Sequence, residues 1–272
     1  MFRLSGRILV VLAGLALPVL ADDPAGLSAP SAPGGISSAE ILNNYETAVE
    51  RQQQELGDLS MQVDISATLP RLKKEGSFHA LRHVTRFGRI TYDGVRFLGD
   101  KVVKKDVIAR YLTAEAEASN NRANGDGNGD VKVVSNGDGK ATAKLASLAI
   151  TQENYKFKYK GMSEHEGRRV HVFQLSPKKK RVGLFKGELW IDPDSNLPVR
   201  EAGRFVKNPS IFLKKVEFVR DYELRDGLSL PSRILSRIDT RIVGRAELNI
   251  LFSNVSVQSG AEQAAMVCPM GW

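Results

Sequence analysis

Glu75, His79 and His83 are spaced four residues apart, an interval that on a helix would align three possible zinc ligands on one face. Gly76 and the alternation of polar and apolar residues around it favour a strand instead. In a strand the two histidines would stand about 13 Å apart, at about 3.3 Å per residue. One zinc ion, with bonds of about 2 Å, cannot bridge that distance. We therefore expect no metal site, and two surface or cross-strand histidines.

A second candidate for metal binding lies in residues 119–140, which are rich in Asn, Gly and Asp. Counted from Asn124, this segment matches the opening positions of a calcium-binding loop. The twelfth position is Ser135, where such a loop requires a bidentate Glu. The segment therefore favours a disordered surface insertion over a calcium site.

Motifs for covalent catalysis are missing from the sequence. It contains no G-x-S-x-G elbow, no P-loop and no G-x-G-x-x-G fingerprint. The single cysteine, Cys268, lies in the aperiodic stretch 258–272, which predicts a loose tail. We expect no catalytic residue, no cofactor and no enzymatic activity. An enzyme would need a polar cluster, such as two carboxylates or a Ser–His pair, that only folding brings together.

The N-terminus predicts export. Arg3 and Arg7 precede the apolar run Ile8–Leu20, and Val19-Leu20-Ala21 forms a small-x-small cleavage site. The run has 13 residues, fewer than the roughly 20 that span a bilayer. We expect residues 1–21 to be a cleaved signal peptide, with an uncleaved anchor as the alternative. No cysteine follows the cleavage site, so a lipid anchor is excluded and a soluble periplasmic protein is predicted.

The chain is basic, with a formal net charge of +8 that falls to +6 when residues 1–21 and their two arginines are removed. Basic charge is common in nucleic-acid-binding proteins, but export argues against nucleic acid as the partner. Anionic membrane surfaces or acidic envelope proteins fit this charge better. The run Pro177–Arg181 fits either a solvated loop or a contact with such a partner. With one cysteine the chain cannot form an internal disulfide, so a packed core must stabilise it.

The elements that follow the leader begin with a helix. Residues 22–36 are rich in Pro, Ala, Ser and Gly and predict a flexible leader. Residues 38–56 then repeat apolar side chains at helical spacing, and Ser37 with Glu40 fits a capping box. This pattern predicts an amphipathic helix whose apolar stripe must cover another element.

Most of the remaining chain alternates with a period of two. The strands predicted from this alternation are 61–67, 76–87, 154–162, 168–176, 212–225, 228–242 and 245–257, together with the hairpin 185–205, whose second arm resumes at Val199, and the stretch 89–99. Glu166-Gly167 and Asp226-Gly227 predict tight hairpins, and Asp93-Gly94 predicts a further one. A short helix is predicted after Gly99, with an apolar side formed by Val107, Ile108, Tyr111 and Leu112.

One face of this sheet should be dry and the other wet. In 232–242 isoleucines face one way while Arg233, Arg237 and Arg241 face the other. Because twist accumulates over many strands, a long meander must curl. We predict a mainly β fold with a few helices: a curled antiparallel sheet, or incomplete barrel, of about ten or eleven strands wrapped around the N-terminal amphipathic helix. Residues 37–257 would form this single domain.

Several segments resemble the LolA/LolB-like superfamily of outer-membrane lipoprotein-sorting proteins. They occur in family order as AEILNNYETAV, LSMQVDISATL, NYKFKYKG, VFQLSPK, FKGELWIDPDSNLPVREAGRFVK and GLSLPSRI. The resemblance runs from about residue 38 to 257 without the insertion. It implies a half-barrel with helical lids and an apolar cavity that shelters acyl chains of a lipoprotein or another lipid-like ligand, delivered to a membrane or envelope protein acceptor.

Candidate residues for the lining of that cavity are apolar side chains of the helix and of the strands. They are Ile41, Tyr45, Val49, Phe185, Leu189, Ile191, Ile234, Ile238, Leu248 and Ile250. The alternative is that they form an ordinary filled core. A carrier that works as a monomer is the leading hypothesis. An envelope regulatory protein on the same fold, which senses lipoproteins or a membrane partner, is the second.

Overall fold

The structure is a computed structural model. It describes residues 36–86, 88–113, 115, 132–135, 141–144, 149–208 and 213–258. All of these lie within one unit of the chain, Ser31–Trp272. The predicted signal peptide, the leader up to residue 35 and the tail after residue 258 lie outside the described residues.

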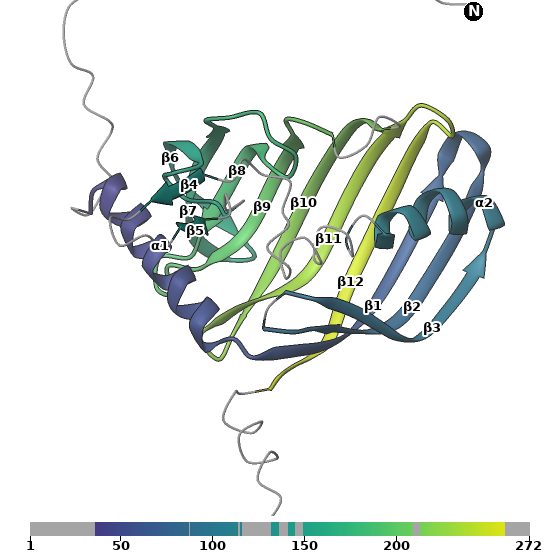
Figure 1. The fold of residues 1–272 in the computed structure, drawn as a ribbon, viewed down its shortest axis with the longest axis horizontal. Coiled ribbons are helices and arrows are strands. Elements are labelled where there is room, and N and C mark those ends of the chain that lie inside the picture. The colour runs from purple at the N-terminus through teal and green to yellow at the C-terminus, as the bar shows by residue number, and fades with distance from the viewer. Residues whose placement is uncertain are drawn as a thin grey trace, which may run out of the picture. The chain divides into compact units, whose positions relative to one another are not determined.

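Ten strands form one antiparallel sheet, in the order β3-β2-β1-β12-β11-β10-β9-β8-β7-β6 (Figure 1). Their bounds are β1 Asp58–Leu69, β2 Lys74–Val84, β3 Ile90–Gly99, β6 Tyr155–His165, β7 Arg168–Pro177, β8 Phe185–Ile191, β9 Pro198–Phe205, β10 Leu213–Arg225, β11 Leu228–Thr240 and β12 Arg245–Gln258. Within the described chain, β3 and β6 at the two ends do not pair with each other, so the sheet is not closed. The prediction of a mainly β, antiparallel and incompletely closed fold is confirmed.

Two of the predicted tight turns form with the backbone that their residues favour. In the β6–β7 turn, Glu166 and Gly167 have φ values of 50° and 77°. In the β10–β11 turn, Asp226 and Gly227 have φ values of 53° and 76°. Positive φ at both central residues gives a two-residue turn the twist of its flanking strands. These turns therefore set the register of the two hairpins.

The predicted hairpin at Asp93-Gly94 is wrong. Strand β3 runs through both residues, and the turn between β2 and β3 lies at residues 85–89. Gly94 does have a positive φ of 61°. It lies where the pairing of β2 with β3 shifts register between His79 and Leu81. A glycine with positive φ suits a β-bulge as well as a turn, and here it forms the bulge.

Helix α1 spans Ser38–Glu55, as the periodicity predicted, and Ser37 caps it by accepting a hydrogen bond from the Glu40 amide at 3.1 Å. The second helical segment begins with α2 (Lys101–Val103), continues as a π-helical turn (Lys104–Ile108) and extends through residue 113. We call residues 101–115 the α2 segment. The described helices include no segment with the length and hydropathy that a bilayer crossing requires.

The predicted insertion 119–140 is described only at Lys132–Ser135. These residues form strand β4, which pairs in antiparallel fashion with β5, Ala141–Lys144. The two strands make a separate sheet of their own. The rest of the insertion lies outside the described residues.

Candidate functional site

A single row of residues crosses all ten strands on one face of the sheet. Residues directly opposite each other in antiparallel neighbours point to the same face. The register joins, from β3 to β6, Phe97, Phe78, Ile65, Ile250, Ile234, Arg220, Glu201, Leu189, Phe173 and Tyr159. We call these residues the central row and their side of the sheet the inner face. The row is apolar or aromatic except for one adjacent pair of charges, Arg220 and Glu201.

The α2 segment covers the inner face at one end of the sheet (Figure 1). Its Val103, Val107 and Ile108 are buried. They pack in one cluster with strand residues of β1, β2 and β12, which we call the α2 cluster; its strand members are Val63, Ile65, Ala67, Leu69, Phe78, Ala80, Ala246, Leu248 and Ile250. The predicted apolar side of this helix is therefore confirmed.

Helix α1 covers the inner face at the other end (Figure 1). Ile41, Leu42 and Tyr45 are the buried side chains of the helix. They pack with residues of β6, β7, β8 and β10 and of the loop before β8 in what we call the α1 cluster; these are Tyr155, Phe173, Leu175, Leu184, Phe185, Leu189, Ile191 and Phe218. Aromatic contacts dominate, and the rings of Phe185 and Phe218 meet edge to face with centroids 5.0 Å apart.

The ten residues predicted to line a cavity divide between these two clusters. Those in or against the α1 cluster are Ile41, Tyr45, Val49, Phe185, Leu189 and Ile191. Those in or against the α2 cluster are Ile234, Ile238, Leu248 and Ile250. The structure thus places all ten on elements of the inner face but brings them together as two groups.

The cover of the inner face is uneven. The outermost members of the central row, Phe97 and Tyr159, are half-buried. Further in, Ile65 and Ile250 on one side and Leu189 and Phe173 on the other are each no more than 1% exposed. Between them, Ile234 of β11 is only half-buried, and the Arg220 side chain of β10 is 36% exposed. The middle of the inner face is therefore less completely covered: Ile234 and Ile238 remain half-buried beside the charged Arg220, and we call these two isoleucines the apolar strip.

Glu201 is the centre of the polar group in the middle of the row. Its side chain is 9% exposed, and its carboxylate accepts hydrogen bonds from Arg220 Nη1 at 3.1 Å and from the Tyr222 hydroxyl at 2.9 Å. The Arg220 guanidinium also lies 4.5 Å from the centroid of the Phe218 ring. Burial raises the pKa of Tyr222 well above its usual value, and the charge of Glu201 raises it further. This group is satisfied internally and presents no free nucleophile.

Tyr45 of helix α1 lies within electrostatic range of this polar group. Burial raises the pKa of Tyr45, and the next cause is the negative charge of Glu201. Near its C-terminal end the helix is fastened by Gln52, whose Oε1 accepts from the Ser229 amide at 2.6 Å and whose Nε2 donates to the Ser229 carbonyl at 3.3 Å. One side chain thus joins the helix to the start of β11.

The α2 segment is fastened in a similar way at its end. Glu115 accepts from Arg82 Nη2 of β2 at 2.8 Å and from the hydroxyl of Tyr92 of β3. The Arg82 side chain is 11% exposed and lies over the Phe252 ring at 5.4 Å. Burial raises the pKa of Tyr92, followed by the charge of Glu115 and its hydrogen bond.

Sequence reasoning missed Arg220, Glu201, Gln52 and Glu115. A signal for the first two was present, because Arg220 continues the inward positions of Val216 and Phe218, and Glu201 occupies an inward position of β9. A charged residue at an apolar position of the alternation indicates a buried partner. The partner itself is set by the register of β9 with β10.

The two histidines of the zinc pattern form cross-strand pairs. His79 Nδ1 lies 2.7 Å from Asp64 Oδ1 on β1, and His83 Nε2 lies 3.2 Å from Asp93 Oδ2 on β3. Across the part of the chain that the structure describes, no group of three or more His, Cys, Asp or Glu is placed to hold a metal ion. Cys268 lies outside that part.

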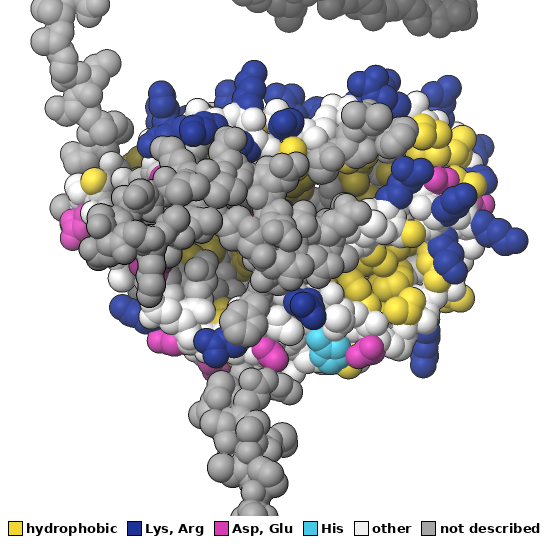
Figure 2. All heavy atoms as spheres, in the orientation of Figure 1, with side chains coloured by type: hydrophobic (Ala, Val, Ile, Leu, Met, Phe, Trp, Pro, Cys, Tyr) yellow, Lys and Arg dark blue, Asp and Glu magenta, His cyan; other side chains and the backbone are white. Residues whose placement is uncertain are grey.

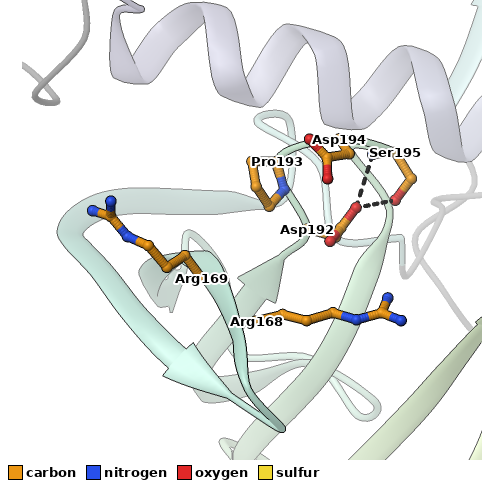
Figure 3. Close-up of a pocket in the computed structure, with 6 residues that line it drawn as sticks. All are labelled: Arg168, Arg169, Asp192, Pro193, Asp194 and Ser195. Carbon is orange, nitrogen blue, oxygen red and sulfur yellow. Dashed lines mark hydrogen bonds between the residues drawn. The ribbon is translucent and has the colours of Figure 1, made fainter.

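An open depression of about 450 Å³ lies at the turns between β6 and β7 and between β8 and β9 (Figure 3). It is lined by Arg168, Arg169 and the turn Asp192–Ser195. The Asp192 carboxylate accepts hydrogen bonds from the Ser195 amide and hydroxyl, both at 2.8 Å. In Figure 3 the two arginines extend away from this carboxylate in different directions. The Asp192 carboxylate stabilises its own turn, and we assign this depression no chemistry.

No family model matches the chain, and no curated protein matches it. Similar solved structures exist at low sequence identity. A DUF1329 family protein from Desulfovibrio piger is 14% identical, with a TM-score of 0.37, and the match covers 81% of this chain and 94% of that chain.

Two further structures carry the name that the sequence motifs indicated. An outer membrane lipoprotein-sorting protein domain from Vibrio parahaemolyticus is 12% identical, with a TM-score of 0.39 and coverage of 83% of this chain and 95% of that chain. A LolA superfamily protein from Nitrosomonas europaea is 10% identical, with a TM-score of 0.34 and coverage of 80% and 96%. Every TM-score here lies below 0.5, so these structures do not assign a function to the chain.

Proposed function

We propose that the protein is an exported, non-catalytic carrier that shelters the acyl chains of a lipoprotein or another lipid-like ligand against its inner face. The observation that supports this most is the uneven cover of the central row. In a fully packed core the middle of the row would be as buried as its neighbours, whereas Ile234 and Ile238, at the border of the α2 cluster, are half-buried. An apolar strip of this kind suits a hydrocarbon chain.

The energetics of such a ligand are those of methylene burial. Each buried CH₂ contributes about 0.8 kcal/mol, so an acyl chain in contact with the strip gains several kcal/mol before the costs of ordering it. Ile234, Ile238 and Val49 are the predicted lining residues that remain half-buried and would contact the ligand first. The buried members, such as Leu189 and Ile250, would form the walls behind it.

The two helices would act as lids. Helix α1 rests on the α1 cluster and is fastened by Gln52, and the α2 segment rests on the α2 cluster and is fastened by Glu115. Each polar fastening can exchange its partners for water when a lid moves, so the main cost of movement is exposure of the apolar cluster beneath the lid. We include in this proposal that the sheet curls around α1.

The remaining parts of the proposal concern where the protein works and with what. A cleaved signal peptide at residues 1–21 would deliver it to the periplasm without a lipid anchor. It would act as a monomer, receive a lipoprotein or lipid-like ligand, and hand it to a membrane or envelope protein acceptor. No step requires a cofactor, a metal ion or nucleic acid.

Titration with a fluorescent fatty acid tests the proposal. The protein is expected to take up the probe, and Ile234→Ser is expected to weaken uptake because it places a hydroxyl on the strip. The matched control is Leu251→Ser, since Leu251 is 44% exposed on the neighbouring strand β12 and points to the other face. Uptake that is absent, or that falls equally in both variants, would contradict the proposal. Capture of a specific envelope protein without uptake of the probe would indicate a regulatory protein instead.

A further inference from the structure

We propose that the loops at one end of the strands dock on a bilayer surface that contains anionic phospholipid. This inference goes beyond the carrier function and does not require a ligand on the inner face. It concerns four loops that join neighbouring strands at the same end of the strands. They are β1–β2 (Pro70–Lys73), β7–β8 (Lys178–Leu184), β9–β10 (described at residues 206–208) and β11–β12 (Arg241–Gly244). We call these four loops the basic edge.

The register places the four loops side by side. A Cβ built on Gly244 would lie 3.7 Å from Arg71 Cδ, so the β11–β12 and β1–β2 loops are in contact. Leu213, which begins β10, pairs with Thr240, which ends β11. The Val206 amide donates to the Leu184 carbonyl at 3.0 Å and joins the β9–β10 and β7–β8 loops. The loops therefore form a continuous edge.

The charge of this edge is of one sign. Its described residues include eight basic side chains and no acidic one; the basic residues are Arg71, Lys73, Lys178, Lys179, Lys180, Arg181, Lys207 and Arg241. All of them except the half-buried Arg181 are exposed. Lys178 and Arg181 donate hydrogen bonds to the Gln152 carbonyl at 2.7 Å and to Asn154 at 2.8 Å, which are uncharged acceptors. Figure 2 shows Lys and Arg side chains along the upper edge, where Figure 1 places these loops.

The exposed carboxylates of Glu75 and Glu153 also lie near the basic edge, and two further carboxylates at its base are paired. Asp100 lies 3.2 Å from Lys74 Nζ, and Asp239 lies 2.9 Å from Arg245 Nε. The opposite edge is mixed in sign, with the acidic residues Glu166, Asp192, Asp194 and Asp226 beside the basic residues Arg86, Arg89, Arg168 and Arg169. The excess of positive charge is therefore greater at the basic edge.

Exposed aliphatic side chains stand among these charges. Leu72, Val182 and Ile242 are 44%, 41% and 66% exposed, and each lies in a different loop of the basic edge. The basic charges alone would be enough to bind an acidic protein segment, so such a partner would not explain the exposed aliphatic side chains. Apolar tips between Lys and Arg fit the interface of an anionic bilayer, where the cations meet phosphate groups and the aliphatic tips enter the acyl boundary.

Co-sedimentation of the full chain with vesicles tests this inference. Vesicles of phosphatidylethanolamine with phosphatidylglycerol are compared with vesicles of phosphatidylcholine alone, at about 0.1 M and about 0.5 M NaCl, because salt shortens the reach of surface charge. The protein is expected to bind the first kind at low salt and to be released at high salt. Equal binding to both kinds, or no binding to either, would overturn the inference.

A pair of matched variants locates the contact. The edge variant reverses four charges of the basic edge, and the control variant reverses four exposed charges at the opposite edge. The substitutions are Arg71→Glu, Lys179→Glu, Lys180→Glu and Lys207→Glu in the first, and Arg86→Glu, Arg89→Glu, Arg168→Glu and Arg169→Glu in the second. Each Lys or Arg near an anionic surface contributes roughly fivefold to partitioning, so the edge variant is expected to bind at least about 100-fold more weakly, and the control less than about 10-fold. Equal losses would show a response to net charge only and would overturn the inference.

A third variant keeps the charge of the basic edge unchanged. It tests the inference independently if the edge variant fails to fold. Leu72→Ser with Ile242→Ser removes two exposed apolar tips and is expected to weaken vesicle binding by about fivefold or more. Unchanged binding of this variant, or capture of an acidic protein by a chain that binds no vesicles, would overturn the assignment to lipid. Vesicle binding that survives in a chain without acyl-ligand uptake would remove the carrier function and leave the docking edge standing.

Discussion

Arg220 and Glu201 lie directly opposite each other on β10 and β9, with Nη1 and Oε2 3.1 Å apart, and form the one charged pair in a row of residues that crosses all ten strands. On one side the row continues as Leu189 and Phe173, and on the other as Ile234 and Ile250. The pair stands where the inner face passes from a closed cluster to the accessible strip. The pair therefore fixes the register of β9 with β10, and with it the position of the two apolar parts of the row relative to each other.

Glu201→Gln is expected to lower the free energy of unfolding by about 2 kcal/mol, because it leaves the Arg220 charge without its carboxylate. Glu217→Gln is the control, since Glu217 lies on β10 in an ion pair with Lys215 at 2.6 Å whose side chains are 37% and 39% exposed. That change is expected to have a clearly smaller effect, because solvent screens an exposed ion pair. Urea unfolding measures both, and equal effects would show that the position of Glu201 on the inner face is of no consequence.

Gln52→Ala is expected to loosen α1. The substitution removes both hydrogen bonds to Ser229 and should cost about 1–2 kcal/mol, with faster amide hydrogen exchange in the second half of the helix. Gln54→Ala is the control, since Gln54 is exposed on the same helix. If α1 is a lid, the Gln52 variant will also release a bound acyl probe faster. Identical exchange in the two variants would contradict the role assigned to this side chain.

The strand pattern could be predicted where local chemistry decides it. Alternation identified the inward residues. Asp226-Gly227 predicted its turn, because the tolerance of positive φ is a property of these residue types themselves. The same preference misled at Asp93-Gly94, where the β2–β3 pairing uses the glycine in a bulge. Local sequence cannot distinguish the two uses.

The polar centre could not be predicted in the same way. Glu201 and Arg220 meet because a loop returns β10 beside β9 in one register, and periodicity in either strand carries no information on that register. The link from Gln52 to Ser229 joins residues 177 positions apart. Such contacts arise from the tertiary fold, so the sequence could indicate an apolar face but not its fastenings.

Gly187→Ala is expected to lower the free energy of unfolding by more than about 2 kcal/mol. Gly187 lies opposite Gly203, and a Cβ on it would come 1.9 Å from the Ala202 carbonyl oxygen. A methyl group cannot fit without separating β8 from β9. Gly94→Ala is the comparison, because no atom lies within 4 Å of its Cβ position and only its φ of 61° opposes the change, at a cost of about 1 kcal/mol. A smaller loss at Gly187 than at Gly94 would contradict the close approach of these strands.

His171 should make stability depend on pH. The residue is 8% exposed, and Tyr159 shares a hydrogen bond with its Nδ1 at 3.0 Å. Burial lowers the pKa of His171 below its usual 6.5, and the charge of Arg169 lowers it further. Below about pH 6.5 the unfolded chain therefore binds a proton that the folded chain does not bind. The free energy of unfolding should fall as the pH decreases below that value.

His171→Gln is expected to lack this part of the slope, because glutamine does not titrate. Urea unfolding of both proteins across about pH 5 to 8 measures the difference. His79→Gln is the control, since the His79 side chain is 44% exposed. Parallel pH profiles for the parent chain and the His171 variant would show that another group is responsible.

Native mass spectrometry of the protein purified from the cell envelope tests the carrier function most directly. The account predicts a population heavier than the bare chain by the mass of an acylated molecule, which an added fatty acid displaces and which Ile234→Ser reduces but Leu251→Ser does not. A protein that always carries the bare mass, and gains none when incubated with lipid or lipoprotein, would contradict it.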